Sequence, residues 1–556
     1  MRFATVCLAL VTVGCGRAEK DAQVSAALQD ALRAKGRPQF VTSDAEGTRL
    51  WTLTREFYGA RDFAPAWIEG SKPGQEIDDL IAAVWAASHE GLDPQLYNVA
   101  LLDGRRREAS KGLLTKKGFP PREAGALDAW LTYLYMKYAS DLADGLSDLA
   151  HADPRWQIRP EKFDPRARLE KALAEGRVAE SLRELTPGNP QYLSLRGTLA
   201  ELRKQDARGG WPRVPKARLK RGERSAAASA VARRLAASGD FAGTPRPDEN
   251  ARVAYDASLV EAVKRFQSRH GLAADGIVGG EVLAEMNVPI AARIAQVQLN
   301  MERWRWLPRE LGARYILVNI PEYHLEVREN GQVPLAMRVV VGTPETPTPI
   351  FNDVMTHVVL SPYWNVPPGI AEEETLPAVL SDAGFLERNN MEIVDQSGNP
   401  VDPASIDLSD PRKYRFRQRP GASNSLGFVK FMFPNQHDVY LHDTPVDSLF
   451  ERASRSFSHG CVRVEQPMAL AQYVLREQPE WTAERLEDAM HAGEERHVKL
   501  KQPIPVYLGY WTTRVSADGL VQFRKDVYGI DARQTRLLDE RLARLRKTMA
   551  SANSRP

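Results

Sequence analysis

A cysteine follows two histidines near the C-terminal end of the chain. The segment LHDTPVDSLFERASRSFSHGCVRV contains His442, His459 and Cys461. A thiol attacks carbonyl carbon as its thiolate, and at its ordinary pKa near 8.5 only about 3% is ionised at neutral pH. The cysteine therefore needs a base or a positive charge beside it. At this point a reactive thiol with its base, a metal site and a chance cluster all remain open.

The residues around the cysteine provide a way to bring a base to it. VYLH ends at His442 and CVRV begins at Cys461, and both are rich in strand-forming residues. If the two strands pair, the imidazole can reach the sulfur and act as the base of nucleophilic acyl transfer. The N–H groups of Gly460 and Cys461 would then face the developing oxyanion. Arg463 would share the strand face of the thiol and could bind a substrate carboxylate.

Other readings of the cluster have weaker support. His437, His442, His459 and Cys461 could bind zinc, but the spacing matches no usual finger and there is no second cysteine nearby. A serine-based site lacks the strand-to-helix elbow that such a nucleophile needs. For His459 two roles stay open, since it either tunes the thiolate or fills the loop.

The N-terminal residues explain why Cys461 stands out. Residues 1–16 contain Arg2 followed by an apolar run, which predicts a secretory signal peptide. Gly14 before Cys15 is similar to the cleavage site of a bacterial lipoprotein, so both lipidation of Cys15 and ordinary cleavage after Gly16 remain open. Of the three cysteines, only Cys461 then lies inside the folded protein, without a disulfide partner.

Bulk composition excludes several classes of protein. With 556 residues the chain is too long for one core, and three or four domains are expected. The formal charge of +3 is too weak and too dispersed to indicate a nucleic-acid partner. Beyond the N-terminal run no segment is apolar enough to span a bilayer. We therefore expect a soluble mature protein whose membrane contact is limited to an N-terminal lipid anchor.

The elements that position the cluster fall into regions of different pattern, which together predict a multidomain α+β fold. Residues 20–210 carry helical periodicity, clearest where Leu127, Leu131, Leu134, Tyr138 and Leu142 share one helix face. Residues 215–288 form a smaller helical module that contains FQSRHGLAADGIVGG. Residues 310–515 are rich in strands, with a hairpin at Asn330-Gly331. HVVLSPYWNV reads as one strand, residues 367–425 read as an inserted lid, and residues 516–556 read as a helical tail.

Two stretches resemble known families. The module at 215–288 resembles three-helix peptidoglycan-binding domains. His442, the loop after it and SHGCVRV resemble the catalytic signature of the L,D-transpeptidases, and nearly the whole chain is similar to their large subclass with scaffold, binding module and lid. The resemblance implies Cys461 as nucleophile, His442 as base and the Asp443 carbonyl as the group that orients it. His459 and Gly460 fall in the catalytic motif, and the residues expected near the donor stem peptide are Tyr440, Trp364, Arg463 and Ser458.

The resemblance also implies an activity and its setting. The expected enzyme lies in the periplasm or cell envelope, forms 3→3 cross-links between peptidoglycan stem peptides through a thioester, and uses no metal or cofactor. Other cell-wall synthesis proteins are its expected partners. An L,D-carboxypeptidase or cysteine peptidase acting on the same stems remains an alternative, although papain-like enzymes place the cysteine before the histidine. A non-catalytic wall-binding scaffold is a second alternative.

Overall fold

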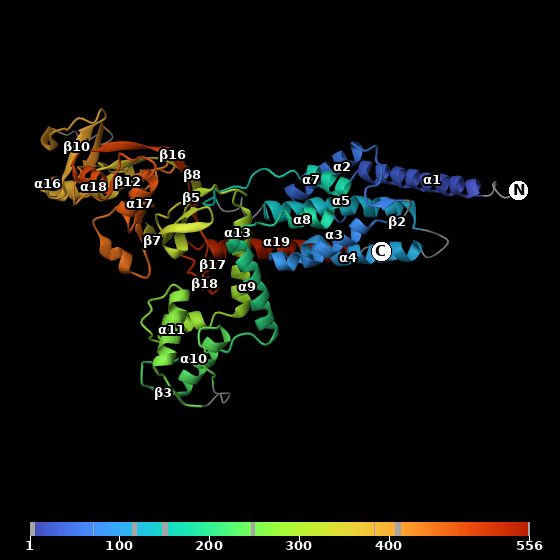
Figure 1. Ribbon diagram of the computed structural model, residues 1–556, viewed down its shortest axis with the longest axis horizontal. Helices are drawn as coiled ribbons and strands as arrows, with labels where there is room; N and C mark the ends of the chain where they lie inside the picture. Colours follow the sequence, from blue (N-terminus) through green and yellow to red (C-terminus); the bar gives the residue numbers. More distant parts are fainter. Residues whose placement is uncertain are drawn as a thin grey trace.

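The computed structural model describes residues 6–553 except 70–71, 114–118, 147–153, 246–250, 383 and 406–412. Helices fill the N-terminal part of the chain, and all of them but the last lie together at one end of the molecule (Figure 1). They are α1 (Val6–Arg33), α2 (Ala45–Gly59), α3 (Gln75–Trp85), α4 (Val99–Leu113), α5 (Pro121–Ala143), α7 (Pro165–Glu175), α8 (Val178–Arg183) and α9 (Pro190–Ala207). Shorter elements between them are β1 (Ile68–Glu69), β2 (Lys72–Pro73), η1 (Ala86–Glu90) and η2 (Pro94–Tyr97).

Helix α5 is the centre of this helical region. The sequence predicted one buried face, but the structure buries almost every residue from Ala124 to Ala143 because other helices surround α5. In α5, both oxygens of the buried Asp128 carboxylate accept hydrogen bonds. Asp128 accepts hydrogen bonds from the Tyr58 hydroxyl at 2.5 Å and from the N–H groups of Ala66, Trp67 and Ile68. These bonds fix the chain after α2 against α5.

A small helical module projects from the rest of the molecule (Figure 1). It contains β3 (Arg224–Ser225), α10 (Ala226–Ala237), β4 (Val253–Ala254), α11 (Ala257–Arg269) and α12 (Gly280–Met286). Ser225 and Asp256 cap α10 and α11 by accepting backbone N–H groups. Leu259, Val263 and Phe266, predicted to share a helix face, are buried in a hydrophobic cluster separate from that of the helical region.

A nine-stranded mixed sheet forms the C-terminal half. Its order is β14-β7-β15-β13-β12-β8-β16-β5-β6, and β7 also pairs with β6, so the sheet closes on itself. The strands are β5 (Arg314–Asn319), β6 (His324–Glu329), β7 (Gln332–Gly342), β8 (Phe351–Leu360), β12 (Val429–Met432), β13 (Leu441–His442), β14 (Ser456–Ser458), β15 (Val462–Val464) and β16 (Arg496–Gly509). The accompanying helices are α13 (Ile290–Arg305), η3 (Ile320–Glu322), η7 (Asp447–Glu451), α17 (Pro467–Leu475) and α18 (Ala483–His491).

The predicted hairpin between β6 and β7 is confirmed. Asn330 and Gly331 have φ values of 48° and 81°, and Glu329 pairs with Gln332 across the turn. Two consecutive residues with positive φ suit a two-residue turn of this kind.

The inserted segment has a sheet and a core of its own. Strand order is β10-β11-β9, and Trp364, Val366, Leu386, Met391 and Ile393 pack together. The prediction of one strand over HVVLSPYWNV is wrong, because β8 ends at Leu360 and Ser361, with φ 48°, redirects the chain. The elements are β9 (Trp364–Asn365), α14 (Pro368–Ile370), a π-helical turn η4 (Ala371–Thr375), α15 (Leu376–Ser381), α16 (Phe385–Arg388), β10 (Met391–Asp395), η5 (Pro403–Ser405) and β11 (Tyr414–Gln418).

The C-terminal segment differs from the helical tail that the sequence predicted. β17 (Thr513–Val515) and β18 (Val521–Phe523) form a hairpin before α19 (Ile530–Asn553) begins. Helix α19 returns to the helical region, where Arg541 lies 3.9 Å from the Asp44 carboxylate. The two ends of the described chain therefore belong to the same part of the molecule.

Four tryptophans join the helical region to the sheet. Trp156 lies 5.0 Å from Trp306 and 6.2 Å from Trp511, and Trp304 stacks on Trp511 at 4.8 Å between ring centroids. All four are buried, and they belong to one hydrophobic cluster that runs from the helices into the sheet. The helical region and the sheet thus share a core.

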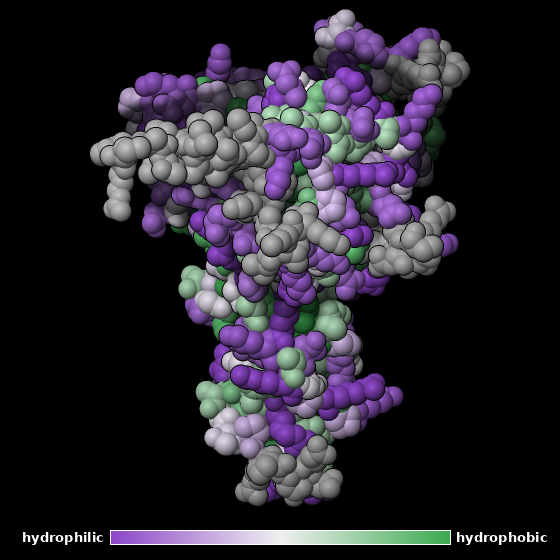
Figure 2. Space-filling view, turned by 90° about the vertical axis from the view of Figure 1, so that its right-hand side faces the viewer, coloured by the Kyte–Doolittle hydropathy of each residue, from purple (hydrophilic) through white to green (hydrophobic). Residues whose placement is uncertain are grey.

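The helices of the described residues were compared with the length and composition of a membrane span. Within the described residues no helix combines the length and apolar composition that crossing a membrane needs. Figure 2 shows hydrophobic residues in small groups among polar ones on the face in view. The expected signal peptide, with Cys15, falls on residues 1–5 and on the first part of α1, whose side chains lie outside the described residues.

Candidate active site

The two short strands on either side of the His442–Cys461 gap pair in parallel, as the sequence predicted. In β13 and β15, Leu441 pairs with Val462 and His442 pairs with Arg463. The Val462 N–H donates to the Tyr440 carbonyl at 3.1 Å, which extends this register by one step. Because side chains alternate along a strand, Tyr440, His442, Cys461 and Arg463 lie on one face of the sheet.

His442 is buried and held in one orientation. Its Nδ1 lies 2.5 Å from the Asp443 carbonyl oxygen. A carbonyl only accepts hydrogen bonds, so Nδ1 carries the proton and Nε2 is the basic nitrogen. Burial, followed by the positive charges of Arg463 and Lys430, lowers the pKa of His442 to about 3. The imidazole is therefore neutral at physiological pH.

Cys461 is half-buried beside Tyr440. Its Sγ lies 3.8 Å from the Asp438 carbonyl oxygen. Burial raises the pKa of the Cys461 thiol, while hydrogen bonds from Tyr440 and the charge of Arg463 act in the opposite direction. Both members of the pair therefore rest in neutral form, and a proton must move from the thiol when it attacks.

The turn before Cys461 is held by hydroxyl groups. Ser458 Oγ donates to the Cys461 carbonyl at 2.5 Å and accepts from the Gly460 N–H at 3.2 Å. Thr348 Oγ1 donates to the Gly460 carbonyl at 2.7 Å. Gly460 has φ +118°, a conformation that side chains other than hydrogen rarely adopt.

This turn shows the surroundings of two residues that were expected to take part in the site. Ser458 was expected to contact substrate, but it is buried and its hydroxyl is engaged with the turn. The Gly460 N–H was expected to face an oxyanion, and here it donates a hydrogen bond to Ser458 Oγ. Of the two N–H groups expected to bind the oxyanion, the Cys461 N–H is the one outside this hydrogen bond. The need for glycine at 460 comes from φ, since an added Cβ would meet nothing closer than the Pro347 carbonyl oxygen at 3.9 Å.

Arg463 presents a cation on the face of the thiol. It is half-buried, and its buried Nε has no hydrogen-bond partner among the described residues. Burial lowers the pKa of Arg463, and the side chain nevertheless stays charged because the ordinary pKa of arginine is so high. The position therefore suits an anionic group that comes from outside the protein.

Two other expected residues contact the insertion or belong to it. His459 Nε2 lies 2.8 Å from Oε1 of Glu374 in η4, so His459 contacts the insertion. Trp364 packs against the core of the insertion. Of the candidate zinc ligands, His437 Nε2 contacts Gln157 Oε1 at 2.9 Å. In the part of the chain that the structure describes, no three His, Cys, Asp or Glu side chains gather as metal ligands.

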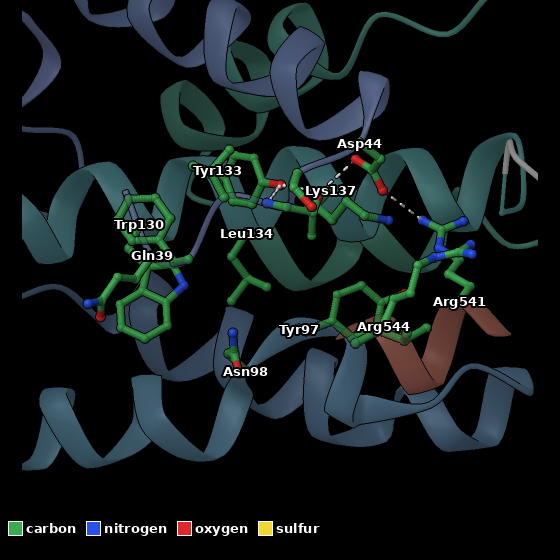
Figure 3. A pocket seen from close by; sticks show the side chains of 15 residues that line it. Gln39, Asp44, Tyr97, Asn98, Trp130, Tyr133, Leu134, Lys137, Arg541 and Arg544 are labelled. Carbon is green, nitrogen blue, oxygen red and sulfur yellow. Dashed lines mark hydrogen bonds and ion pairs between the residues drawn. The ribbon is translucent and has the colours of Figure 1, made fainter. Parts of the chain in front are cut away.

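A cavity outside this site lies in the helical region (Figure 3). Its walls come from residues 39–44, η2, α5 and α19. The Thr42 N–H donates to the Tyr133 hydroxyl at 3.1 Å, and Lys137 pairs with Asp141. No cysteine or histidine is among the lining residues, so this cavity provides no nucleophile and base of the kind found at Cys461.

Three family models match the chain. A "Scaffold domain" matches residues 52–199, a "Putative peptidoglycan binding domain" matches 224–286, and an "L,D-transpeptidase catalytic domain" matches 313–494. His442 and Cys461 lie in the third match. The matched stretches fall in the regions that the sequence predicted, and the domain boundaries themselves stay predictions.

Individual relatives are similar over part of the chain. A Haemophilus influenzae protein named "Putative L,D-transpeptidase" is 36% identical over 239 residues, which are 42% of this chain and 48% of that protein, so about half of its length is spanned. Among solved structures, an L,D-transpeptidase from Mycobacterium smegmatis is 15% identical over 35% of this chain and 58% of that chain, with a TM-score of 0.17. One from Xylanimonas cellulosilytica is 15% identical over 53% and 99%, with a TM-score of 0.18. TM-scores this low do not establish a similarity of fold.

The fold and the site define a multidomain α+β protein with a cysteine and a histidine on paired strands. The family matches find in it an L,D-transpeptidase catalytic domain of the YkuD type over residues 313–494, together with a scaffold domain and a peptidoglycan-binding domain.

Sequence reasoning missed three residues at the site, namely Thr348, Glu374 and Lys430. Lys430 pairs with His442 across β12 and β13. A signal for it exists in LGFVKFMF, where a lysine alternates with apolar residues in a strand. No comparable pattern marks Glu374, whose contact depends on the path of the insertion.

Proposed function

We propose that the protein is a peptidoglycan L,D-transpeptidase that forms 3→3 cross-links between stem peptides through a Cys461 thioester. One observation carries the proposal: inside the matched catalytic domain, parallel β13 and β15 hold His442 and Cys461 on one face of the sheet. The order of the two residues, histidine first, separates this arrangement from papain-like peptidases.

The acylation step follows from the tautomer of His442. Nε2 accepts the thiol proton as sulfur attacks the carbonyl on the L-centre of the diamino acid at stem position three. The Cys461 N–H donates to the resulting oxyanion. When the intermediate collapses, the C–N bond breaks, the terminal D-Ala nitrogen takes the proton from Nε2, and a thioester remains. The thiol, the imidazole and the leaving group therefore account for every proton and bond of this step, and no cofactor is needed.

The second step transfers the acyl group to an amine. An amino group of a neighbouring stem attacks the thioester carbonyl, gives its proton to His442, and the Cys461 thiol is restored. Water in place of the amine would yield a trimmed stem. We propose that the insertion, which reaches the Cys461 loop through Glu374 and His459, covers the donor and favours the amine over water.

Arg463 provides the anchor for the donor. Its half-buried guanidinium lies on the face of the thiol without a carboxylate partner among the described residues. A donor carboxylate would form a charge-assisted hydrogen bond there. Tyr440, whose hydroxyl contacts the thiol, would lie against the same ligand.

The setting follows from the accompanying domains. The peptidoglycan-binding module would keep the enzyme at the wall, and the envelope is the place where its substrate exists. A signal peptide at 1–16, lipidation of Cys15 and contacts with other cell-wall synthesis proteins belong to the same proposal.

Mass spectrometry of muropeptides tests the proposal. Purified wild-type protein and Cys461→Ala are incubated with tetrapeptide stems. We expect 3→3 dimers with the wild type and none with the variant, which should still bind sacculi. Dimers formed by the alanine variant would refute the cysteine mechanism. Tripeptides without dimers would assign a carboxypeptidase, and unchanged stems with bound sacculi would assign a scaffold.

A further inference from the structure

Lys430 lies in the same row of the sheet as His442 and Arg463. β12 pairs with β13 so that Lys430 is opposite His442, and β13 pairs with β15 so that His442 is opposite Arg463. Residues directly opposite each other on neighbouring strands point to the same face. The row therefore runs from one cation, through the candidate base, to a second cation.

Neither cation forms an ion pair with a carboxylate of the described residues. Lys430 is half-buried, and its ammonium lies 6.0 Å from the centre of the Tyr440 ring. Among the described residues no carboxylate is within ion-pairing distance of Lys430 or Arg463, although Glu495 attracts Lys430 from further away. The other partly buried cations of this sheet are paired, as Arg338 is with Glu465, Arg328 with Glu326 and Arg314 with Glu477.

Leaving two cations unpaired and partly buried is unfavourable for the free protein. A charged group removed from water needs a compensating partner, and burial lowers the pKa of Lys430. The two cations also repel a proton on His442, since both contribute to its low pKa. Lys430 and Arg463 therefore neither stabilise the fold nor make His442 a stronger base. Their position points to a ligand that supplies negative charge.

We propose that Lys430 is a specificity residue of the acyl-donor site: it binds a second donor carboxylate while Arg463 binds the first, so the site selects donors with two free carboxylates around the scissile carbonyl. The inference rests on the proposed function. In a stem tetrapeptide the first group, bound by Arg463, is the terminal carboxylate. The second, bound by Lys430, is the free carboxylate on the far centre of the diamino acid at position three.

Binding of such a donor then changes the pKa of His442, in addition to strengthening the binding of the donor itself. Two carboxylates neutralise the charges on both sides of His442, which removes the repulsion and raises its pKa. The imidazole becomes a stronger base when a donor with both groups occupies the site. A donor with one carboxylate converted to an amide leaves one cation facing His442.

The experiment compares two tetrapeptide donors that differ only in the far carboxylate of the diamino acid, which is free in one and a carboxamide in the other. The rate of D-Ala release and the mass of the acylated full-length protein are measured. We expect wild type to favour the free acid in kcat/KM by about tenfold or more, as loss of a hydrogen-bonded charge pair predicts. In Lys430→Met this ratio should fall toward one, and Lys430→Arg should restore it.

Control variants and outcomes separate the inference from the proposed function. Lys499→Met removes an exposed cation of the same sheet and should keep the ratio of wild type. If wild type releases D-Ala from neither donor, the proposed function fails. If wild type uses both donors equally, or if Lys430→Met slows both by the same factor, the function stands and the assignment of Lys430 is overturned.

Discussion

His459 Nε2 lies 2.8 Å from Glu374 Oε1, and this pair links the loop of Cys461 to the inserted segment. The two side chains are 48% and 57% exposed, so water and salt screen their attraction. A weak contact of this kind, two residues from the nucleophile, can break and form as the insertion moves. The sequence left the role of His459 open. In the structure this residue lies where the insertion contacts the catalytic sheet.

Removing this contact should change the fate of the thioester. In Glu374→Gln we expect hydrolysis to rise relative to cross-linking by about two- to fivefold, since exposed pairs contribute little. Quantifying tripeptides against 3→3 dimers by mass spectrometry measures the ratio. Glu373→Gln, which removes an exposed carboxylate from the same turn, is the matched control. The same ratio in both variants would exclude the pair as a means of holding the insertion closed.

The Cys461 thiol should react slowly with alkylating agents at neutral pH and faster as the pH rises, because burial raises its pKa. Tyr440→Phe removes a hydrogen bond that stabilises the thiolate, so the pKa should rise further and alkylation at pH 8 should slow about three- to tenfold. Peptide mapping of carbamidomethylated Cys461 reports the rate. Tyr473→Phe, whose hydroxyl contacts Glu329, should leave it unchanged. Faster alkylation in Tyr440→Phe would contradict this geometry.

His442 should make the protein sensitive to acid. Its pKa is lowered to about 3 in the folded state, so the unfolded chain binds the proton first as the pH falls below about 6.5. The stability present above pH 6.5 is lost progressively toward pH 3, by about 2 kcal/mol at pH 5. Chemical denaturation at pH 7.5 and 5 should show a smaller loss for His442→Asn than for wild type. Equal losses would mean that the imidazole is not held neutral.

Gly460→Ala should damage the nucleophile turn through backbone strain. A side chain at φ +118° costs about 1–3 kcal/mol, and relaxation of that strain would move Cys461 away from Tyr440. We expect cross-linking to fall at least tenfold while thermal unfolding changes modestly. Gly369→Ala, where an added Cβ meets nothing within 4 Å and φ is not positive, should behave as wild type. Full activity in Gly460→Ala would show that the turn is not required.

Local pattern predicted much of this architecture from sequence. Strand propensity on both sides of the His442–Cys461 gap predicted the pairing of β13 with β15, and Asn330-Gly331 predicted a hairpin, because both depend on short-range backbone preferences. Alternation along one strand places Arg463 and Cys461 on the same face, and the register of β13 and β15 adds His442 to that face.

What the sequence did not predict depends on contacts between distant segments. Glu374 meets His459 across 85 residues, through an insertion whose path no periodicity describes. Lys430 joins the row of His442 only after β12 has paired with β13. The hydrogen bonds of the Ser458 hydroxyl to the Cys461 carbonyl and from the Gly460 N–H could not be predicted either, because they depend on the conformation of the turn.

The shared tryptophan cluster determines where this chain can be divided. Without the helical region, Trp306 and Trp511 would lose the cover of Trp156, and the sheet would present a large aromatic surface to water. The peptidoglycan-binding module and the insertion each enclose a core of their own. Evolution or an engineer could therefore exchange these two units and keep the enzyme, whereas the scaffold and the catalytic sheet must be inherited together.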